Sequence, residues 1–95
     1  MQIIWSDEAI ADYHQNIDYL EKEWSSQVAL EFIEDVEAAI ELIKRHPALY
    51  PLADYRKIRK AVIRKQITLF FRVQDKRVQL IRFWNNYQAP EKLKF

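Results

Sequence analysis

Six positively charged side chains lie within ten consecutive residues in the second half of the chain. They are Arg56, Lys57, Arg59, Lys60, Arg64 and Lys65. Guanidinium and ammonium groups at this density can neutralise phosphate oxygens or the carboxylates of an acidic partner. The plainer interpretation is a solvated strand edge whose charge prevents aggregation. Because six cations exceed what edge protection requires, and Phe70 and Phe83 follow nearby for stacking, we favour binding of a target or of RNA.

The charge of the whole chain divides near Pro47. Residues 1–47 contain eleven Asp and Glu against three Lys and Arg, whereas residues 48–95 contain three against twelve. The formal net charge of +1 therefore hides an acidic half and a basic half. The two halves can attract each other, and the basic half can present a positive field to phosphates or to an acidic protein.

Other kinds of chemistry find little support in the sequence. The chain has no cysteine, and neither His14 nor His46 has a second ligand at metal spacing. There is no Ser/His/Asp set, Walker loop or dinucleotide fingerprint. The chain also lacks a secretory signal and any apolar run near the ~20 residues that cross a bilayer. We therefore expect a cytoplasmic protein without metal, cofactor or membrane association.

Two amphipathic helices are predicted in the acidic half. Ser6 can cap a helix over residues 7–23, and Ser25 and Ser26 can cap a second helix that ends before Pro47. The short connection makes the helices antiparallel. The apolar stripes are Ala9, Ile10, Tyr13, Ile17, Leu20 and Trp24 in the first helix, and Ala29, Phe32, Ile33, Val36, Ile40 and Ile43 in the second. The acidic residues, Asp12 among them, are expected on the solvated side.

The basic half predicts strands over residues 56–63, 67–73 and 78–84, after a loop over residues 47–55. These strands form an antiparallel meander, and residues 2–5 can add a strand at its edge. Since the chain has no glycine, its turns must be longer or use Asn, Asp and Lys. The expected fold is α+β, with an N-terminal antiparallel helical hairpin packed on a small, mainly antiparallel sheet in a single domain over residues 1–95.

A register follows if Val73 pairs with Val78, because Leu69 then faces Arg82 and Phe70 faces Ile81. The side toward the helices carries Ile67, Leu69, Phe71, Val73, Val78, Leu80 and Trp84, and the open side carries Thr68, Phe70, Arg72, Gln79, Ile81 and Phe83. If Ile58 and Val62 also face the helices, Lys57, Arg59 and Arg72 share the open side. A one-residue bulge would exchange the sides.

The basic set that we expect to bind a target is Lys57, Arg59, Lys60, Arg64 and Arg72. Arg72 and Arg82 have an alternative role as partners of the acidic helices, and the register favours a structural role for Arg82 in particular.

Residues along nearly the whole chain resemble one protein family. They are Trp5-Ser6, Ala9, Ile17, Tyr19-Leu20, Trp24-Ser25, the Ala29/Phe32/Ile33 helix, Pro47, Pro51, Arg59, Val62-Ile63, Leu69 to Val73, and Gln88 to Leu93. In this order and spacing they resemble the RelE/ParE superfamily of bacterial toxins. The resemblance implies a toxin of a type II toxin–antitoxin system that arrests growth until a cognate antitoxin neutralises it.

The resemblance leaves two mechanisms open. RelE-like members are metal-independent endonucleases that cut ribosome-bound mRNA, and Arg59 and Tyr87 are then the catalytic candidates, offsetting phosphate charge and moving protons. Tyr87 has an equally good interpretation as a packing aromatic residue. ParE-like members poison DNA gyrase and lack the nuclease set. Near Thr68, where a nuclease would carry arginine, this chain is neutral, which favours the ParE-like mechanism slightly. A third hypothesis is a non-toxic nucleic-acid-binding or adaptor domain.

Overall fold

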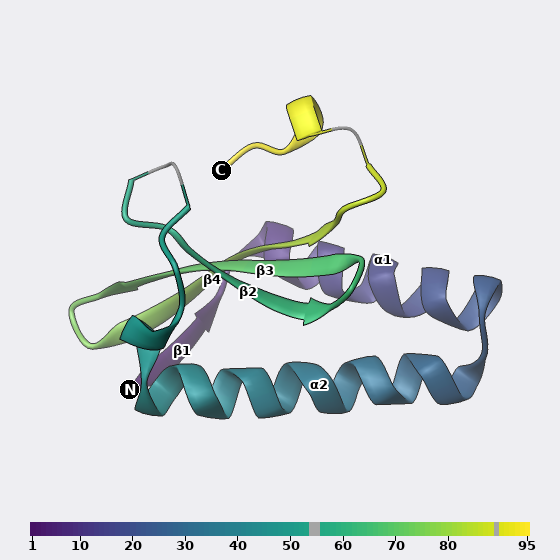
Figure 1. Ribbon diagram of the computed structural model, residues 1–95, viewed down its shortest axis with the longest axis horizontal. Coiled ribbons are helices and arrows are strands. Elements are labelled where there is room, and N and C mark those ends of the chain that lie inside the picture. The colour runs from purple at the N-terminus through teal and green to yellow at the C-terminus, as the bar shows by residue number, and fades with distance from the viewer. Residues whose placement is uncertain (54–55, 89) are drawn as a thin grey trace.

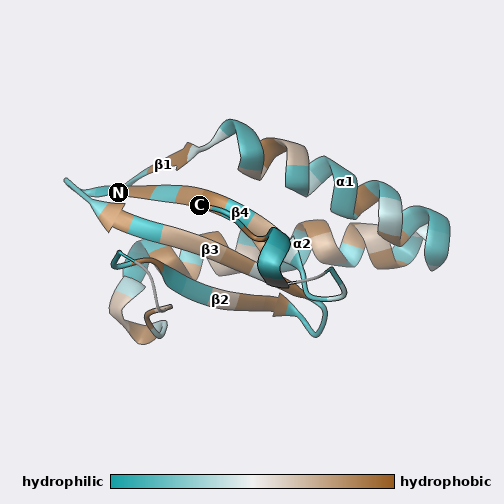
Figure 2. Ribbon diagram, turned by 90° about the horizontal axis from the view of Figure 1, so that it is seen from above, coloured by the Kyte–Doolittle hydropathy of each residue, from teal (hydrophilic) through white to brown (hydrophobic). Residues whose placement is uncertain are grey.

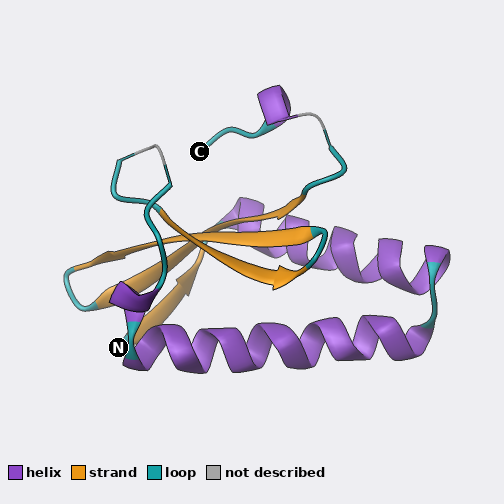
Figure 3. Cartoon of the chain, viewed as in Figure 1, coloured by secondary structure: helices purple, strands orange, loops and turns teal. Residues whose placement is uncertain are grey.

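The computed structural model describes residues 1–53, 56–88 and 90–95. The elements follow the chain in the order β1 (Gln2–Trp5), α1 (Asp7–Glu23), α2 (Ser26–Arg45), a 3-10 helix (Pro47–Leu49), β2 (Arg59–Arg64), β3 (Ile67–Gln74), β4 (Arg77–Asn85) and a second 3-10 helix (Pro90–Lys92). Figure 3 distinguishes the two long helices, in purple, from the strands, in orange. The end of the loop predicted over residues 47–55 lies outside the described residues.

The four strands form one mixed sheet in the order β1-β4-β3-β2. Strands β2, β3 and β4 are an antiparallel meander as predicted, and β1 joins the edge of β4 in parallel. Both long helices cover one face of the sheet, with α1 on β4 and α2 on β2 (Figure 1). The predicted α+β fold is confirmed. None of the described helices is long and apolar enough to span a bilayer.

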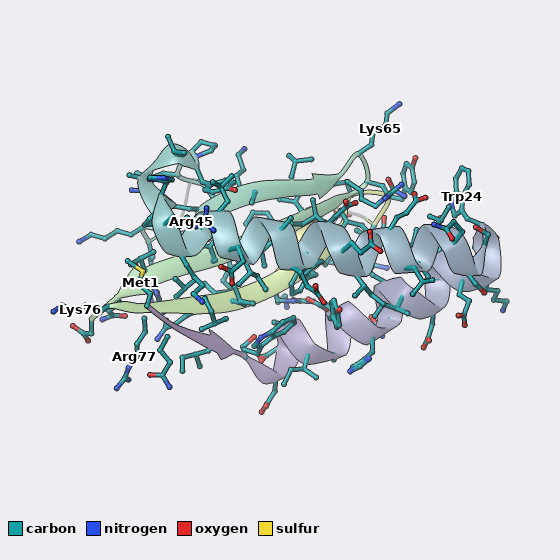
Figure 4. The ribbon with its side chains drawn as sticks, turned by 90° about the horizontal axis from the view of Figure 1, so that it is seen from below. Met1, Trp24, Arg45, Lys65, Lys76 and Arg77 are labelled. Carbon is teal, nitrogen blue, oxygen red and sulfur yellow. The ribbon has the colours of Figure 1, made fainter. Side chains whose placement is uncertain are left out.

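Both helices begin where their caps predict. The Ser6 hydroxyl accepts a hydrogen bond from the Ala9 amide at 2.9 Å, and the Ser25 hydroxyl accepts one from the Val28 amide at 3.1 Å. The predicted apolar stripe of α1 includes two residues that are not buried, since Ile10 is 44% and Trp24 65% exposed. Trp24 is the residue at which the helix ends, so it leaves the stripe and points outward at the tip of the hairpin (Figure 4).

The register of β3 and β4 holds near their turn and then shifts. Val73 pairs with Val78 as predicted, but a bulge between Phe70 and Phe71 places Phe70 opposite Arg82 and Leu69 opposite Phe83. The predicted pairs of Leu69 with Arg82 and of Phe70 with Ile81 are therefore wrong. Because the extra residue inverts the end of β4, Phe83 lies in the core under the helices and Trp84 lies on the opposite side.

Apolar residues are buried on both faces of the sheet. The larger cluster lies between the sheet and the helices, and its biggest buried side chains are Phe32, Phe71 and Phe83. The smaller cluster consists of Ile58, Phe70 and Trp84, against which Ala53, Ile81 and Leu93 pack. The C-terminal segment accordingly crosses the face of the sheet that the helices leave uncovered (Figures 1 and 2).

The side chains of strand β2 point to the opposite faces of the sheet from those predicted. Ile58 belongs to the smaller cluster, Val62 is 71% exposed, and Ala61 is the residue buried under the helices. The expectation that Ile58 and Val62 face the helices is therefore wrong. The residues on either side of Ala61 point to the face away from the helices.

The turns without glycine use residues in the left-handed region. Asp75 and Lys76, with φ of 54° and 60°, form the two-residue turn between β3 and β4. Arg56 and Lys57, with φ of 39° and 61°, precede β2. The predicted use of Asp and Lys in turns is confirmed.

Candidate functional site

Arg59 does not lie on the open side of the sheet. It pairs with Phe71, whose side chain is buried under the helices, and directly paired residues point to the same face. Its guanidinium donates a 2.6 Å hydrogen bond to the Tyr50 carbonyl. The prediction that Arg59 shares a face with Arg72 is therefore wrong, because β2 is inverted relative to the expected register.

Arg64 is held by the second helix. Its Nη1 donates to Asp35 at 2.9 Å, and its Nη2 lies 3.7 Å from Glu31. The Arg64 side chain is 26% exposed, so it bridges β2 and α2 at the rim of the core. This contact is the attraction between the two halves of the chain that the charge asymmetry predicts.

Three lysines of the basic segment remain on the surface without a side-chain partner among the described residues. Lys60 pairs with Phe70 across the sheet and so projects from the face opposite the helices. Lys57 is exposed in the turn before β2. Lys65 is exposed at the turn at one end of the sheet, and Lys76 and Arg77 are exposed at the other end (Figure 4).

Arg72 lies on the face away from the helices, opposite Gln79 on β4. Its Nε and Nη2 donate to the Gln79 side-chain oxygen at 3.3 and 3.2 Å. The two residues line a cavity of about 380 Å³, which Arg56 and the C-terminal Phe95 also border. The predicted placement of Arg72 on the open side is confirmed.

Tyr87 is 73% exposed beyond the end of β4, so the interpretation as a packing aromatic residue is wrong. Its amide donates to the Asn85 side chain at 3.0 Å. Asn85 pairs with Ile67, whereas Arg59 pairs with Phe71, four positions further along β3. At about 3.3 Å per residue, this offset is roughly 13 Å along the strands. The two candidate catalytic residues are thus far apart, and Arg59 faces the helices.

The sequence analysis missed a contact between α1 and β4. Asp12, which was expected on the solvated side, is buried. Its carboxylate accepts hydrogen bonds from Arg82 Nε at 2.6 Å, Arg82 Nη2 at 3.0 Å and the Phe83 amide at 3.1 Å. The hydrogen bond from Arg82 to Asp12 is the main reason why the pKa of Arg82 is raised. The predicted structural role of Arg82 is confirmed. Asp12 and Asn16 fall at helical spacing with buried Ala9 and Leu20, a polar interruption of the apolar stripe that could have indicated this contact.

The described residues contain no group of three or more His, Cys, Asp and Glu that could hold a metal ion. The polar side chains on the face opposite the helices include Lys60, Arg72 and Gln79. Lys57 and Lys60 can contact an anionic partner at the surface, and Arg72 can do so within the cavity.

Comparisons with known proteins agree with this geometry. The family described as "ParE toxin of type II toxin-antitoxin system, parDE" matches residues 3–90. The structure is similar to one from the chromosomal ParDE system of P. aeruginosa, with a TM-score of 0.75, 18% identity and coverage of 90% of this chain and 95% of that one. A comparison with curated protein sequences gives no match.

Two further solved structures have the same fold. The YoeB/ParE toxin from Agrobacterium tumefaciens has a TM-score of 0.65 and 17% identity, over 90% of this chain and 98% of that one. A chain of the DinJ-YafQ complex from E. coli has a TM-score of 0.60 and 17% identity, over 90% and 93%. The family match covers most of the chain, and toxin–antitoxin complexes among these neighbours support a cognate antitoxin as its partner. The chain belongs to the ParE toxin family and is the toxin component of a type II toxin–antitoxin system.

Proposed function

We propose that this toxin arrests growth in the cytoplasm by poisoning DNA gyrase and not by cutting mRNA. The observation that carries the proposal is the separation of Arg59 from Tyr87. Cleavage by an attacking 2′-hydroxyl needs a cation at the phosphate and an acid–base group within hydrogen-bond reach of the same atoms. Arg59 is instead bonded to the Tyr50 carbonyl on the helix side, and Asn85, two residues before Tyr87, is offset from it by roughly 13 Å along the strands. A poison of a DNA-bound enzyme needs a binding surface but no such pair.

The target surface that we propose centres on Lys57 and Lys60. Both are exposed, and Lys60 lies on the edge strand β2 beside Val62, which is 71% exposed. An exposed apolar side chain beside a cation adds contact area to the charge of the surface. Arg59 and Arg64, which the sequence analysis placed in the target-binding set, hold the fold together through Tyr50 and α2 and contribute less to this surface.

The test is a pair of assays on the purified toxin. We expect inhibition of gyrase supercoiling, with trapped DNA breaks, and no cleavage of mRNA on translating ribosomes. Replacing Lys57 and Lys60 together by glutamine should weaken gyrase inhibition at least tenfold, while Lys22→Gln on the exposed side of α1 should leave it unchanged. Full activity of the double variant would remove these lysines from the target surface.

The same experiments separate the alternatives. Cleavage of ribosome-bound mRNA that disappears in Tyr87→Phe or Arg59→Gln would establish the nuclease mechanism and overturn the gyrase proposal. Normal growth of bacteria that demonstrably express the toxin without its antitoxin would favour the harmless adaptor domain. We further propose that the antitoxin neutralises the toxin through an acid-rich segment that folds over the positive face of the sheet.

A further inference from the structure

The cavity on the face opposite the helices has a floor built from paired strand positions. Ile4 on β1 pairs with Gln79 on β4, and Gln79 pairs with Arg72 on β3, so the three side chains form one row across the sheet. The walls above this row include Ile58 and Phe95. At about 380 Å³ the cavity falls within the range of small-ligand sites, which start near 300 Å³.

Arg72 supplies the cavity with a cation whose hydrogen bonds go to a neutral group, and no described Asp or Glu lines it. Arg56 and Arg72 both line it, and none of the described residues along its wall is Asp or Glu. The side-chain hydrogen bonds of Arg72 both go to the neutral amide oxygen of Gln79, through Nε and Nη2. A partly buried guanidinium with a neutral acceptor gains a stronger, charge-assisted hydrogen bond when an anion arrives.

The turn that carries Arg56 supports a binding role. Arg56 and Lys57 both have positive φ, which costs a non-glycine residue energy and is concentrated at functional sites. Arg56, which this turn carries, lines the same cavity as the Ile4-Gln79-Arg72 row. The backbone conformation and the charge of the cavity thus point to the same place.

We infer that this cavity receives a carboxylate side chain of the antitoxin, flanked by apolar residues, with Arg72 as its main contact. Ile4, Ile58 and Phe95 provide apolar walls that fit a leucine- or valine-sized neighbour of the acidic residue. A planar carboxylate matches the guanidinium fork in a bidentate geometry. This inference rests on the antitoxin partnership in the proposed function and does not depend on gyrase being the target.

A nucleic-acid backbone fits the cavity less well than a peptide does. Surfaces that follow a phosphate backbone use a groove of cations that contacts successive phosphates, together with exposed aromatic platforms. This cavity offers two arginines within apolar walls, and the exposed lysines lie outside it. The geometry accordingly favours a single anionic group attached to an apolar chain.

Binding is tested by NMR on the isotope-labelled full chain with three probes. They are a capped pentapeptide with glutamate between two leucines, the same peptide with glutamine, and a five-nucleotide single strand of DNA. We expect the glutamate peptide to shift the amide signals of Arg72, Gln79 and Ile81 and to bind at least tenfold more tightly than the glutamine peptide. No binding of the glutamate peptide, equal binding of both peptides, or tighter binding of the oligonucleotide would overturn the inference.

Matched variants connect the cavity to the antitoxin. Arg72→Gln should abolish binding of the peptide and weaken the complex with the cognate antitoxin at least tenfold, whereas Arg77→Gln, an exposed cation at the sheet end, should change either by less than twofold. Arg72→Lys keeps the charge without the fork, so it should give an intermediate loss even if Arg72→Gln fails to fold. Unchanged antitoxin affinity in both Arg72 variants would remove the antitoxin from this cavity. Since neither assay contains gyrase, failure here and failure of the gyrase proposal are distinguishable.

Discussion

Replacing Asp12 by alanine tests the contact that joins α1 to β4. The Asp12 carboxylate accepts two hydrogen bonds from Arg82, at 2.6 and 3.0 Å, and one from the Phe83 amide at 3.1 Å. The side chains of Asp12 and Arg82 are only 10% and 18% exposed. The substitution therefore leaves a largely buried guanidinium without its counter-charge and a buried amide without its acceptor.

The cost can be estimated from these contacts. Removing one partner of a buried ion pair typically costs about 3–5 kcal/mol, and an orphaned buried amide costs about 1–3 kcal/mol. The two terms are not additive, and Arg82 can turn partly toward water, so we expect a loss of about 3 kcal/mol. For a chain of 95 residues, this corresponds to a fall in Tm of roughly 12–24 °C. Natural domains have only about 5–15 kcal/mol of stability in total, so the variant should be marginal.

Urea unfolding followed by circular dichroism measures this loss, with Asp18→Ala as the matched control. Asp18 is an exposed carboxylate on the same helix, and its replacement should change the free energy of unfolding by less than about 0.5 kcal/mol. A double-mutant cycle with Arg82→Ala should give a coupling energy of about 2 kcal/mol. A loss below about 1 kcal/mol in Asp12→Ala, or independent effects of the two substitutions, would refute the reasoning.

Three smaller effects follow from other parts of the structure. Arg64→Ala should cost about 0.5–1 kcal/mol, and less at high salt, because the bridges to Asp35 and Glu31 are partly exposed; urea unfolding at two salt concentrations measures this. Burial, helped by the charge of Glu37, raises the pKa of Tyr13 above its usual 10.0. Since the unfolded chain loses this proton near pH 10 while the folded chain retains it, stability should fall as the pH rises above 10, and Tyr13→Phe should flatten that fall in urea titrations. Trp24→Ala should change the free energy of unfolding by less than about 0.5 kcal/mol, because the ring is 65% exposed; thermal unfolding measures this.

The helices could be predicted from the sequence because their limits are set by local chemistry. A serine side chain that accepts an amide bond fixes each start, and Pro47 fixes the end of the second helix whatever the rest of the chain does. Their apolar stripes are also a property of neighbouring residues alone. The fold class follows from these signals together with the alternating runs in the basic half.

The bulge in β4 could not be predicted in the same way, because its stabilisation comes from residues distant in sequence. It brings Phe83 under the helices, where its ring centroid lies 5.4 Å from that of Trp5 and 5.7 Å from that of Tyr13. It also places the Phe83 amide and the Arg82 guanidinium beside Asp12. Strict alternation along β4 predicts Trp84 in this position, and only the shape and polarity of the α1 surface decide against it.

The orientation of β2 was missed for a related reason. Ile58, Ala61 and Val62 offer apolar residues to both faces of the strand, so alternation gives no clear answer. The smaller cluster, which needs Ile58 beside Phe70 and Trp84, decides it. When the faces of a strand are exchanged, every side chain moves to the other side of the sheet. Arg59 therefore lies on the opposite face from Arg72, and the expected basic set does not form one surface.

Four arginines of the basic half make fixed contacts, which the exposed lysines of the basic segment do not make. Arg64 and Arg82 bind carboxylates of the helices, while Arg59 and Arg72 bind a carbonyl and an amide. In contrast, the exposed lysines of the basic segment have no side-chain partner among the residues that the structure describes. The flat, weakly hydrated guanidinium suits fixed contacts in partly buried positions, whereas the strongly hydrated ammonium stays in water. A target that meets this surface therefore meets solvated lysine charges, which attract anions over a distance but specify little geometry. Selectivity must then come from the apolar and arginine-lined features beside them, and affinity for the target should fall steeply with salt.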